Sequence, residues 1–289
     1  MDRISEALQR ARQERGGERV AFGESTKPRL PEDASQSAAG EIAYTRTPCV
    51  EVPRETLAAQ RVVSGFEPCM FTDAFKILST QVSQKLRDNN WNTLAVTSPN
   101  EHVGKTVVAV NLAISLAMEF HQTALLVDAD LRRPKLRTAL GLDPGPGLSD
   151  YLLSHRPVEE LLIHPGIKGL VILPGGAPLL NSSELLGSRQ MAELVKELKS
   201  RYRSRIVVFD LPPLLTAADV IAFAPQVDAA LLVVEEGRTR AEDVSRTAEL
   251  LSATHLIGTV LNKSREAPVA ADKPYGYGYG YGYGYGRKG

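Results

Sequence analysis

A Gly-Lys-Thr triplet, Gly104-Lys105-Thr106, follows an apolar stretch and opens a segment with helical periodicity. Strand, loop, Gly-Lys-Thr and helix is the order that a phosphate-binding loop requires, because the loop amides and the helix N-terminus face the phosphates. In such a loop Lys105 reaches the β- and γ-phosphate oxygens, and the Thr106 hydroxyl binds Mg²⁺. The strict pattern has glycine five residues before Gly104, where this sequence has Pro99. Alone, the triplet is weak evidence, since an ordinary helix can begin in the same way.

Two later apolar stretches end in carboxylates. Asp128 and Asp130 follow the first, with Arg132 two residues further on, and Asp210 follows the second. Because the carboxyl ends of parallel strands share one edge of an open sheet, these acids are expected beside the phosphate loop. Three acids next to phosphates need a divalent cation to balance their charge. The alternative is that Asp128 and Asp210 only cap the turns that follow them.

The elements that must position these residues alternate between strand and helix. Short apolar runs predict six strands, over residues 94–97, 124–127, 170–173, 206–209, 229–234 and 257–261. Periodic stretches between them predict helices, among them 107–119, 189–202 and 240–252. Strands without polar alternation are covered on both faces. The pattern therefore predicts an α/β fold of the P-loop NTPase kind, a mostly parallel sheet flanked by helices on both faces.

The remaining segments divide the chain into four parts. Residues 1–15 have apolar side chains at helical spacing among four arginines, which predicts a short amphipathic helix that either frays or docks. Residues 16–68 lose this periodicity and are interpreted as a flexible linker. Residues 69–266 hold the phosphate loop and the acids. Residues 267–289 alternate tyrosine with glycine and are interpreted as a disordered tail.

Composition excludes several classes of protein. The 289 residues carry 34 basic and 34 acidic side chains, so the formal net charge is zero and no nucleic-acid partner is expected. Cys49 and Cys69 lie outside any disulfide or metal-ligand spacing, which favours a reducing cytosol. The apolar runs are shorter than the roughly 20 residues that a membrane-spanning helix needs.

The combination of motifs resembles the bacterial tyrosine autokinases of capsule and exopolysaccharide biosynthesis, of the CpsD/CapB type, within the MinD/ParA-like P-loop superfamily. The Asp-x-Asp-x-Arg run at residues 128–132 lies between the phosphate loop and Asp-Leu-Pro at 210–212, as in that family, and a terminal tyrosine cluster follows. Further matches are Gly-Leu-Ser-Asp-Tyr-Leu at 147–152, Leu-Pro-Gly-Gly at 173–176 and Asn-Ser-Ser-Glu-Leu-Leu at 181–186. The first eight residues are similar to the opening helix of exosortase-associated members. The resemblance covers about residues 70–289.

The resemblance implies an ATP- and Mg²⁺-dependent tyrosine kinase that phosphorylates its own C-terminal tyrosines and regulates exopolysaccharide polymerisation and export. It implies a catalytic group made of Lys105, Asp128, Asp130 and Arg132. Nucleotide binding would fall to Val103, Gly104, Lys105, Thr106, Val107 and Asn262. The Mg²⁺ shell would comprise Thr106, Asp128 and Asp210. The acceptors would be Tyr275, Tyr277, Tyr279, Tyr281, Tyr283 and Tyr285. Asn262 resembles an asparagine that contacts adenine in related ATPases; alternatively, it only caps a strand end.

The same resemblance implies partners and a location. A membrane chain-length regulator of a polysaccharide export system would activate the kinase, a cognate tyrosine phosphatase would reverse its action, and copies of the chain would self-associate. The protein would be cytoplasmic and peripherally recruited to the inner face of the membrane, because the chain itself lacks a predicted span.

Two positions depart from the family pattern. His102 stands where the family usually has glycine, two residues before Gly104. The ring-assembly motif Glu-x-x-Arg-x-x-Arg is replaced by Asp73-x-x-Lys76-x-x-Ser79, which lacks the last arginine. This second departure argues against a closed ring.

Two other classes of function stay open. A MinD/ParA-like ATPase would act by nucleotide-driven dimerisation without kinase activity, although Asn100 occupies the position where those dimeric ATPases present a lysine. An inactive scaffold would use its Tyr-Gly segment to self-associate or to stack on bases, although few cations accompany these tyrosines. Phosphoamino-acid analysis after incubation with labelled ATP and Mg²⁺ separates all three.

Overall fold

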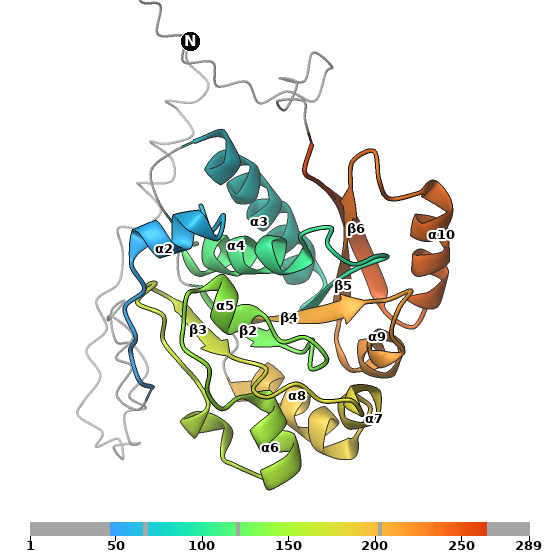
Figure 1. Ribbon diagram of the computed structural model, residues 1–289. Helices are drawn as coiled ribbons and strands as arrows, with labels where there is room; N and C mark the ends of the chain where they lie inside the picture. Colours follow the sequence, from blue (N-terminus) through green and yellow to red (C-terminus); the bar gives the residue numbers. More distant parts are fainter. Residues whose placement is uncertain (1–46, 66–68, 120–121, 202–203, 265–289) are drawn as a thin grey trace, which may run out of the picture. The chain divides into compact units, whose positions relative to one another are not determined.

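A computed structural model of the chain describes residues 47–65, 69–119, 122–201 and 204–264, and within them a six-stranded parallel sheet (Figure 1). The strand order is β3-β2-β4-β1-β5-β6. The strands are β1 (Thr93–Ser98), β2 (Thr123–Asp128), β3 (Leu170–Leu173), β4 (Arg205–Pro213), β5 (Ala229–Glu235) and β6 (His255–Asn262). Each predicted strand lies within one of them, and the predicted α/β fold is confirmed. The predicted helix over 1–15 and the tyrosine tail lie outside the described residues.

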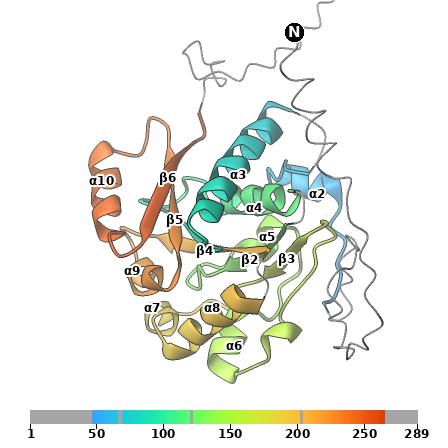
Figure 2. The same cartoon turned by 180° about the vertical axis from the view of Figure 1, so that it is seen from behind.

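Helices cover both faces of this sheet (Figures 1 and 2). One face carries α2 (Arg54–Ala59), α3 (Met70–Asp88), α4 (Lys105–Ala117) and α5 (Leu136–Ala139). The other packs against α6 (Leu148–Ser154), α7 (Ser182–Leu186), α8 (Arg189–Arg201), α9 (Asp219–Phe223) and the end of α10 (Ala241–Leu250). Two 3₁₀ turns occupy Val158–Glu160 and Ala224–Gln226. Within the described ranges, no helix combines the length and apolar character needed to cross a membrane.

Successive residues of the inner strands enter two separate cores. In β1, Leu94 and Val96 join the core beneath α4, whereas Ala95 joins the opposite core with α8 and α9. The Phe209 ring of β4 packs in this second core, with its centroid 5.0 Å from that of Phe223. Full burial of such side chains stabilises the fold by about 1.5–3 kcal/mol each. Burial on both faces explains why the strands read as continuous apolar runs.

Residues 47–65 belong to the predicted linker, yet they pack against the fold. Helix α2 buries Leu57, and Val62 is buried just beyond it; both side chains are 2% exposed or less. The Val50 N–H donates to the His164 carbonyl at 2.9 Å. The linker predicted over 16–68 therefore does not extend through 47–65. Few apolar residues at irregular spacing anchor this segment, so it has no periodic signal in the sequence.

Strand register brings the acids together. Asp210 in β4 pairs with Asp128 at the end of β2, and on its other side with Val96 in β1. Since β4 lies between β1 and β2, the phosphate loop that follows β1 and the acids that end β2 reach the same edge of the sheet. The acids therefore converge beside the phosphate loop, as predicted.

Asp228, just before β5, connects the start of β1 to helix α8 at the amino ends of the strands. Its carboxylate accepts hydrogen bonds from the N–H groups of Asn92 and Thr93 and from the Thr93 hydroxyl, and it pairs with Lys199. Burial alone would raise the pKa of Asp228, but the hydrogen bonds from Lys199, Thr93 and Asn92 outweigh it and leave the pKa lowered.

A carboxyl group whose pKa is lowered by folding stabilises the folded state above its unfolded pKa, about 3.9, and this contribution is lost as the pH falls through the folded pKa. We therefore expect Asp228→Asn to lower the free energy of unfolding by about 1–3 kcal/mol at pH 7, and the difference from wild type to shrink below about pH 4. Urea unfolding between pH 7 and pH 3 measures both. Asp88→Asn, at an exposed helix end, is the matched control. A difference that stays constant with pH would contradict this assignment.

Candidate active site

The loop between β1 and α4 turns sharply before the helix begins at Lys105. His102 and Gly104 both have positive φ, 64° and 90°. A Cβ atom on Gly104 would lie 2.3 Å from Asn262 Nδ2, and a residue with a side chain would be strained at φ 90°, so both observations favour glycine there. His102 occupies the left-handed region that the family's usual glycine adopts freely, and histidine tolerates this region better than branched residues do.

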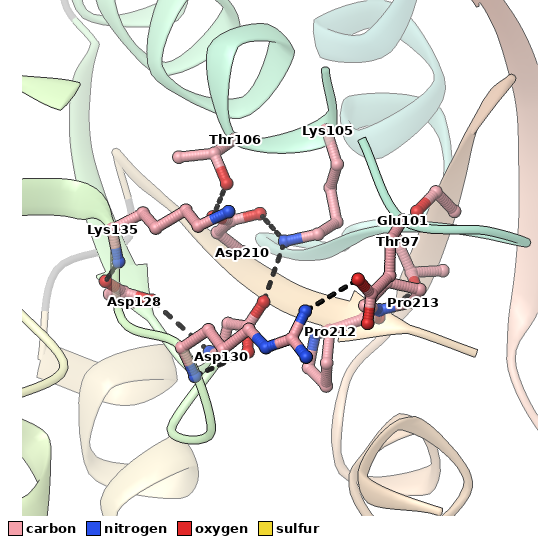
Figure 3. Close-up of polar contacts among 12 residues, drawn as sticks. Thr97, Glu101, Lys105, Thr106, Asp128, Asp130, Lys135, Asp210, Pro212 and Pro213 are labelled. Carbon is pink, nitrogen blue, oxygen red and sulfur yellow. Dashed lines mark hydrogen bonds and ion pairs between the residues drawn. The ribbon is translucent and has the colours of Figure 1, made fainter. Parts of the chain in front are cut away.

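Lys105 lies at the centre of the polar contacts in Figure 3. Its Nζ donates to Asp210 Oδ1 at 2.8 Å and lies 3.4 Å from Asp130 Oδ2, and its side chain is only 8% exposed. Thr106 Oγ1 donates to the other oxygen of Asp210 at 2.7 Å. Burial alone would lower the pKa of Lys105, but the charges of Asp210 and Asp130 outweigh it and raise the pKa. The lysine is thus a buried cation held by two strand-end acids.

Asp128 has different surroundings. Its Oδ2 accepts the backbone N–H groups of Lys135 and Leu136, both at 2.9 Å, and its Oδ1 accepts that of Asp130 at 3.3 Å. Burial, followed by the charge of Asp210, raises the pKa of Asp128 to about 7. In this arrangement Asp128 holds the loop after β2. Its roles as a metal ligand and as a catalytic group stay predictions.

Arg132 is held by a residue that the sequence analysis missed. Its Nε donates to Asp219 Oδ2 at 3.0 Å, and the fully buried Asp219 also accepts a hydrogen bond from the Ser182 hydroxyl. Asp219 begins α9 outside any motif, so the sequence offered no signal for it. Ser182 lies in the Asn-Ser-Ser-Glu run that carried part of the resemblance.

A pocket of about 340 Å³ opens where these elements meet. It is lined by the phosphate loop, the loop after β2 and the end of β4. The residues that line it are Ser98, Asn100, Glu101, His102, Gly104, Lys105, Thr106, Val107, Asp130, Arg132, Arg133, Lys135, Pro212, Pro213, Thr216 and Ala217. Cations and loop amides on the same wall make the pocket suitable for phosphate groups.

Four predicted site residues in the described part of the chain do not line the pocket: Val103, Asp128, Asp210 and Asn262. Asn262 ends β6, and its Nδ2 donates to the carbonyl of Val103, a buried residue of the phosphate loop, at 2.7 Å. The contact of Asn262 with adenine stays a prediction.

The donor groups suit Mg²⁺ bound together with phosphates. Mg²⁺ usually keeps several waters and binds through one or two carboxylates plus substrate phosphates. The Thr106 hydroxyl and the Asp210 carboxylate touch one another beside the pocket, and Asp130 lines it. Within the described ranges, no group of three or more His, Cys, Asp or Glu side chains is arranged to hold a metal ion. A site completed by nucleotide oxygens is therefore the arrangement that fits.

This sheet, with a phosphate loop at its edge and acids ending two strands, is that of a P-loop nucleotide-binding domain. Residues 94–271 match the family described as the CobQ/CobB/MinD/ParA nucleotide binding domain. The chain is also similar to the tyrosine-protein kinase YwqD of Bacillus subtilis, with 31% identity over 206 residues that cover 70% of this chain and 86% of YwqD. The chain belongs to the bacterial tyrosine-protein kinases of this nucleotide-binding family, which confirms the family and the enzyme class predicted from the motifs.

Other similarities agree with this assignment. ExoP of Rhizobium meliloti, named a succinoglycan biosynthesis transport protein, is 33% identical over 214 residues; these cover 71% of this chain but 26% of ExoP. The crystal structure of the chimerical protein CapA2B2 superimposes with a TM-score of 0.66 at 26% identity, covering 76% of this chain and 94% of that one. MinD of Pyrococcus horikoshii, complexed with Mg-ADP, gives a TM-score of 0.51 at 25% identity, covering 59% of this chain and 69% of MinD.

Proposed function

We propose that this kinase transfers the γ-phosphate of ATP to the tyrosines of its own C-terminal segment and thereby regulates exopolysaccharide polymerisation and export. The observation that carries the proposal is a phosphate-binding pocket, lined by Lys105 and Asp130, in a chain that also supplies six closely spaced tyrosines. The proposed catalytic part is residues 69–266. The proposed acceptors are Tyr275, Tyr277, Tyr279, Tyr281, Tyr283 and Tyr285.

Phosphoryl transfer requires mainly positioning and charge neutralisation. In the proposed mechanism the backbone amides of residues 103–107 bind the phosphates. The Lys105 ammonium group leaves Asp210 and Asp130 and contacts the β- and γ-phosphate oxygens instead. Thr106 and Asp210 would hold Mg²⁺, which would supply positive charge next to the phosphates. Arg132, oriented by Asp219, faces that group from the pocket wall.

Asp130 is the proposed acceptor of the phenol proton. It lines the pocket, whereas the oxygens of Asp128, the other candidate, already accept three backbone N–H groups. Burial raises the pKa of Asp130, and the positive charge of Lys105 only partly opposes this. A more basic carboxylate at the pocket wall is better matched to taking a proton from the incoming hydroxyl.

Accumulated charge is the proposed output. Six phosphates at roughly −1.5 to −2 each would add about −9 to −12 to each tail, which disfavours close packing of copies of the chain. The similar protein ExoP is named a succinoglycan biosynthesis transport protein. We accordingly propose that a membrane chain-length regulator recruits and activates the kinase at the inner face of the membrane, and that a cognate tyrosine phosphatase resets it.

Replacing all six tail tyrosines with phenylalanine is expected to remove most phosphotyrosine while ATP binding persists, because the substitutions leave the residues that line the described pocket unchanged. Replacing one alone should have little effect, since near-identical Tyr-Gly units are interchangeable. Incubation with labelled ATP and Mg²⁺, followed by mass mapping of phosphate, measures this.

Tyr151→Phe, in α6, is the matched control for loss of a hydroxyl in the folded part of the chain. Phosphate confined to Tyr44, Tyr151 or Tyr202 would refute the tail as acceptor. ATP hydrolysis without any phosphotyrosine would instead indicate a MinD/ParA-like ATPase.

A further inference from the structure

The carbonyl groups of the phosphate loop are held from outside the pocket by the end of β6. Asn262 Nδ2 donates to the Val103 carbonyl at 2.7 Å, and Lys263 Nζ donates to the His102 carbonyl at 2.6 Å. Neither Asn262 nor Lys263 lines the pocket. We call these two donors the carbonyl clamp.

The clamp is itself anchored to the neighbouring strand. Lys263 Nζ lies 3.0 Å from Glu235 Oε2, at the end of β5, and the Glu235 side chain is only 13% exposed. The backbone N–H of Glu235 donates to Thr239 Oγ1 at 2.9 Å, which ties the end of β5 to the turn that follows it. β5 and β6 pair up to Glu235 opposite Asn262, with one register shift after Ala230, so the two strand ends lie side by side at the base of the clamp.

Peptide geometry gives the clamp a consequence for the pocket. In a trans peptide the C=O and the following N–H point in opposite directions. Holding the carbonyls of His102 and Val103 therefore turns the N–H groups of Val103 and Gly104 away from β6. Backbone amides bind an anion only when several of them point at it together.

The backbone conformation shows why such holding is needed. His102 and Gly104, on either side of Val103, both have positive φ. Histidine at φ 64° lies in a region that side-chain-bearing residues visit at a cost. Rotation of either peptide out of this arrangement would aim a carbonyl oxygen, rather than an amide, at the phosphates.

We propose that Asn262 and Lys263 are positioning residues for the nucleotide phosphates, acting through the loop carbonyls and not by touching the nucleotide. This inference rests on the proposed ATP-binding function of the same site. The proposed role of Asn262 differs from the contact with adenine that the resemblance implies. Lys263 belongs to none of the sequence motifs and gains a role here.

Two ligands separate the two roles of Asn262: Mg²⁺-ATP, which carries adenine, and Mg²⁺-tripolyphosphate, which does not. Isothermal titration of the full chain is expected to show that Asn262→Ala and Lys263→Met each weaken binding of both ligands by a similar factor, about tenfold. Lys196→Met, at an exposed site on α8, should leave both affinities unchanged.

Each other outcome is decisive. If Asn262→Ala weakens binding of ATP but not of tripolyphosphate, Asn262 contacts adenine and the clamp is refuted for that residue. Unchanged affinity in both variants refutes the clamp altogether. A wild-type chain that binds neither ligand overturns the proposed function, and the clamp with it.

A conservative variant distinguishes hydrogen-bond donation from general support of the fold. Lys263→Arg keeps a donor and a positive charge, so it should recover most of the affinity that Lys263→Met loses. Binding is measured below the unfolding temperature of both variants, because Lys263→Met also removes the cation paired with the largely buried Glu235. If Lys263→Arg binds as weakly as Lys263→Met, donation to the His102 carbonyl is not the reason for the effect.

Discussion

Lys105→Met is expected to lower the rate of phosphotyrosine formation by about 10²–10³-fold, the usual cost of removing one donor that stabilises transition-state charge. The side chain is the buried cation of the pocket, at 2.8 Å from Asp210 Oδ1 and 3.4 Å from Asp130 Oδ2. Methionine fills the same volume but carries neither charge nor donor. Single-turnover transfer from labelled ATP measures the effect.

The same substitution should also lower stability, because it leaves two buried carboxylates without their cation. Removing one partner of a buried pair costs about 3–5 kcal/mol, and protonation of the acids reduces this loss. Activity is therefore compared below the unfolding temperature of the variant, with the exposed Lys196→Met as control. Undiminished phosphotyrosine in folded Lys105→Met would overturn the assignment of the phosphate loop.

Asp210→Asn is expected to weaken Mg²⁺-ATP binding by about 10–100-fold and to raise the Mg²⁺ concentration needed for half-maximal activity. Asparagine keeps the size of the side chain and an acceptor for Thr106, but it removes the negative charge that faces the cation. Nucleotide titrations at several Mg²⁺ concentrations measure both quantities. Asp88→Asn controls for the loss of one carboxylate elsewhere, and equal affinity in wild type and Asp210→Asn would remove Asp210 from the Mg²⁺ site.

Much of this fold was predictable because its signals are local. Most strands contain a short apolar run, and Asp128 and Asp210 stand directly after the runs of β2 and β4. Since parallel strands share a carboxyl edge, knowing the strands was enough to bring Lys105, Asp128 and Asp210 together. The prediction ended β4 at Phe209, but the strand continues to Pro213. The Thr97 hydroxyl donates to the Pro212 carbonyl from the neighbouring strand, a contact that no local pattern encodes.

The contacts that support the site were not predictable, because they are not local in the sequence, although Asn262 itself was named through the family resemblance. Asp219 acts on Arg132 from 87 positions away, and Asn262 reaches Val103 from 159 positions away. Neither belongs to a spacing that periodicity can detect, because their proximity depends on which strands are neighbours in the finished sheet. Helix α2 was missed because its buried contact to the fold rests on the single residue Leu57.

The order of the strands bears on how the protein is made. During translation, β1, β2 and β3 leave the ribosome first, yet β1 and β2 are not neighbours in the sheet: β4 lies between them. A nascent chain that ends before residue 205 possesses the phosphate loop, Asp128 and Asp130, but it lacks both Asp210 and the strand that holds the two halves in register. Such non-local pairing forms late. The site described above is therefore complete only after most of the catalytic part has been synthesised.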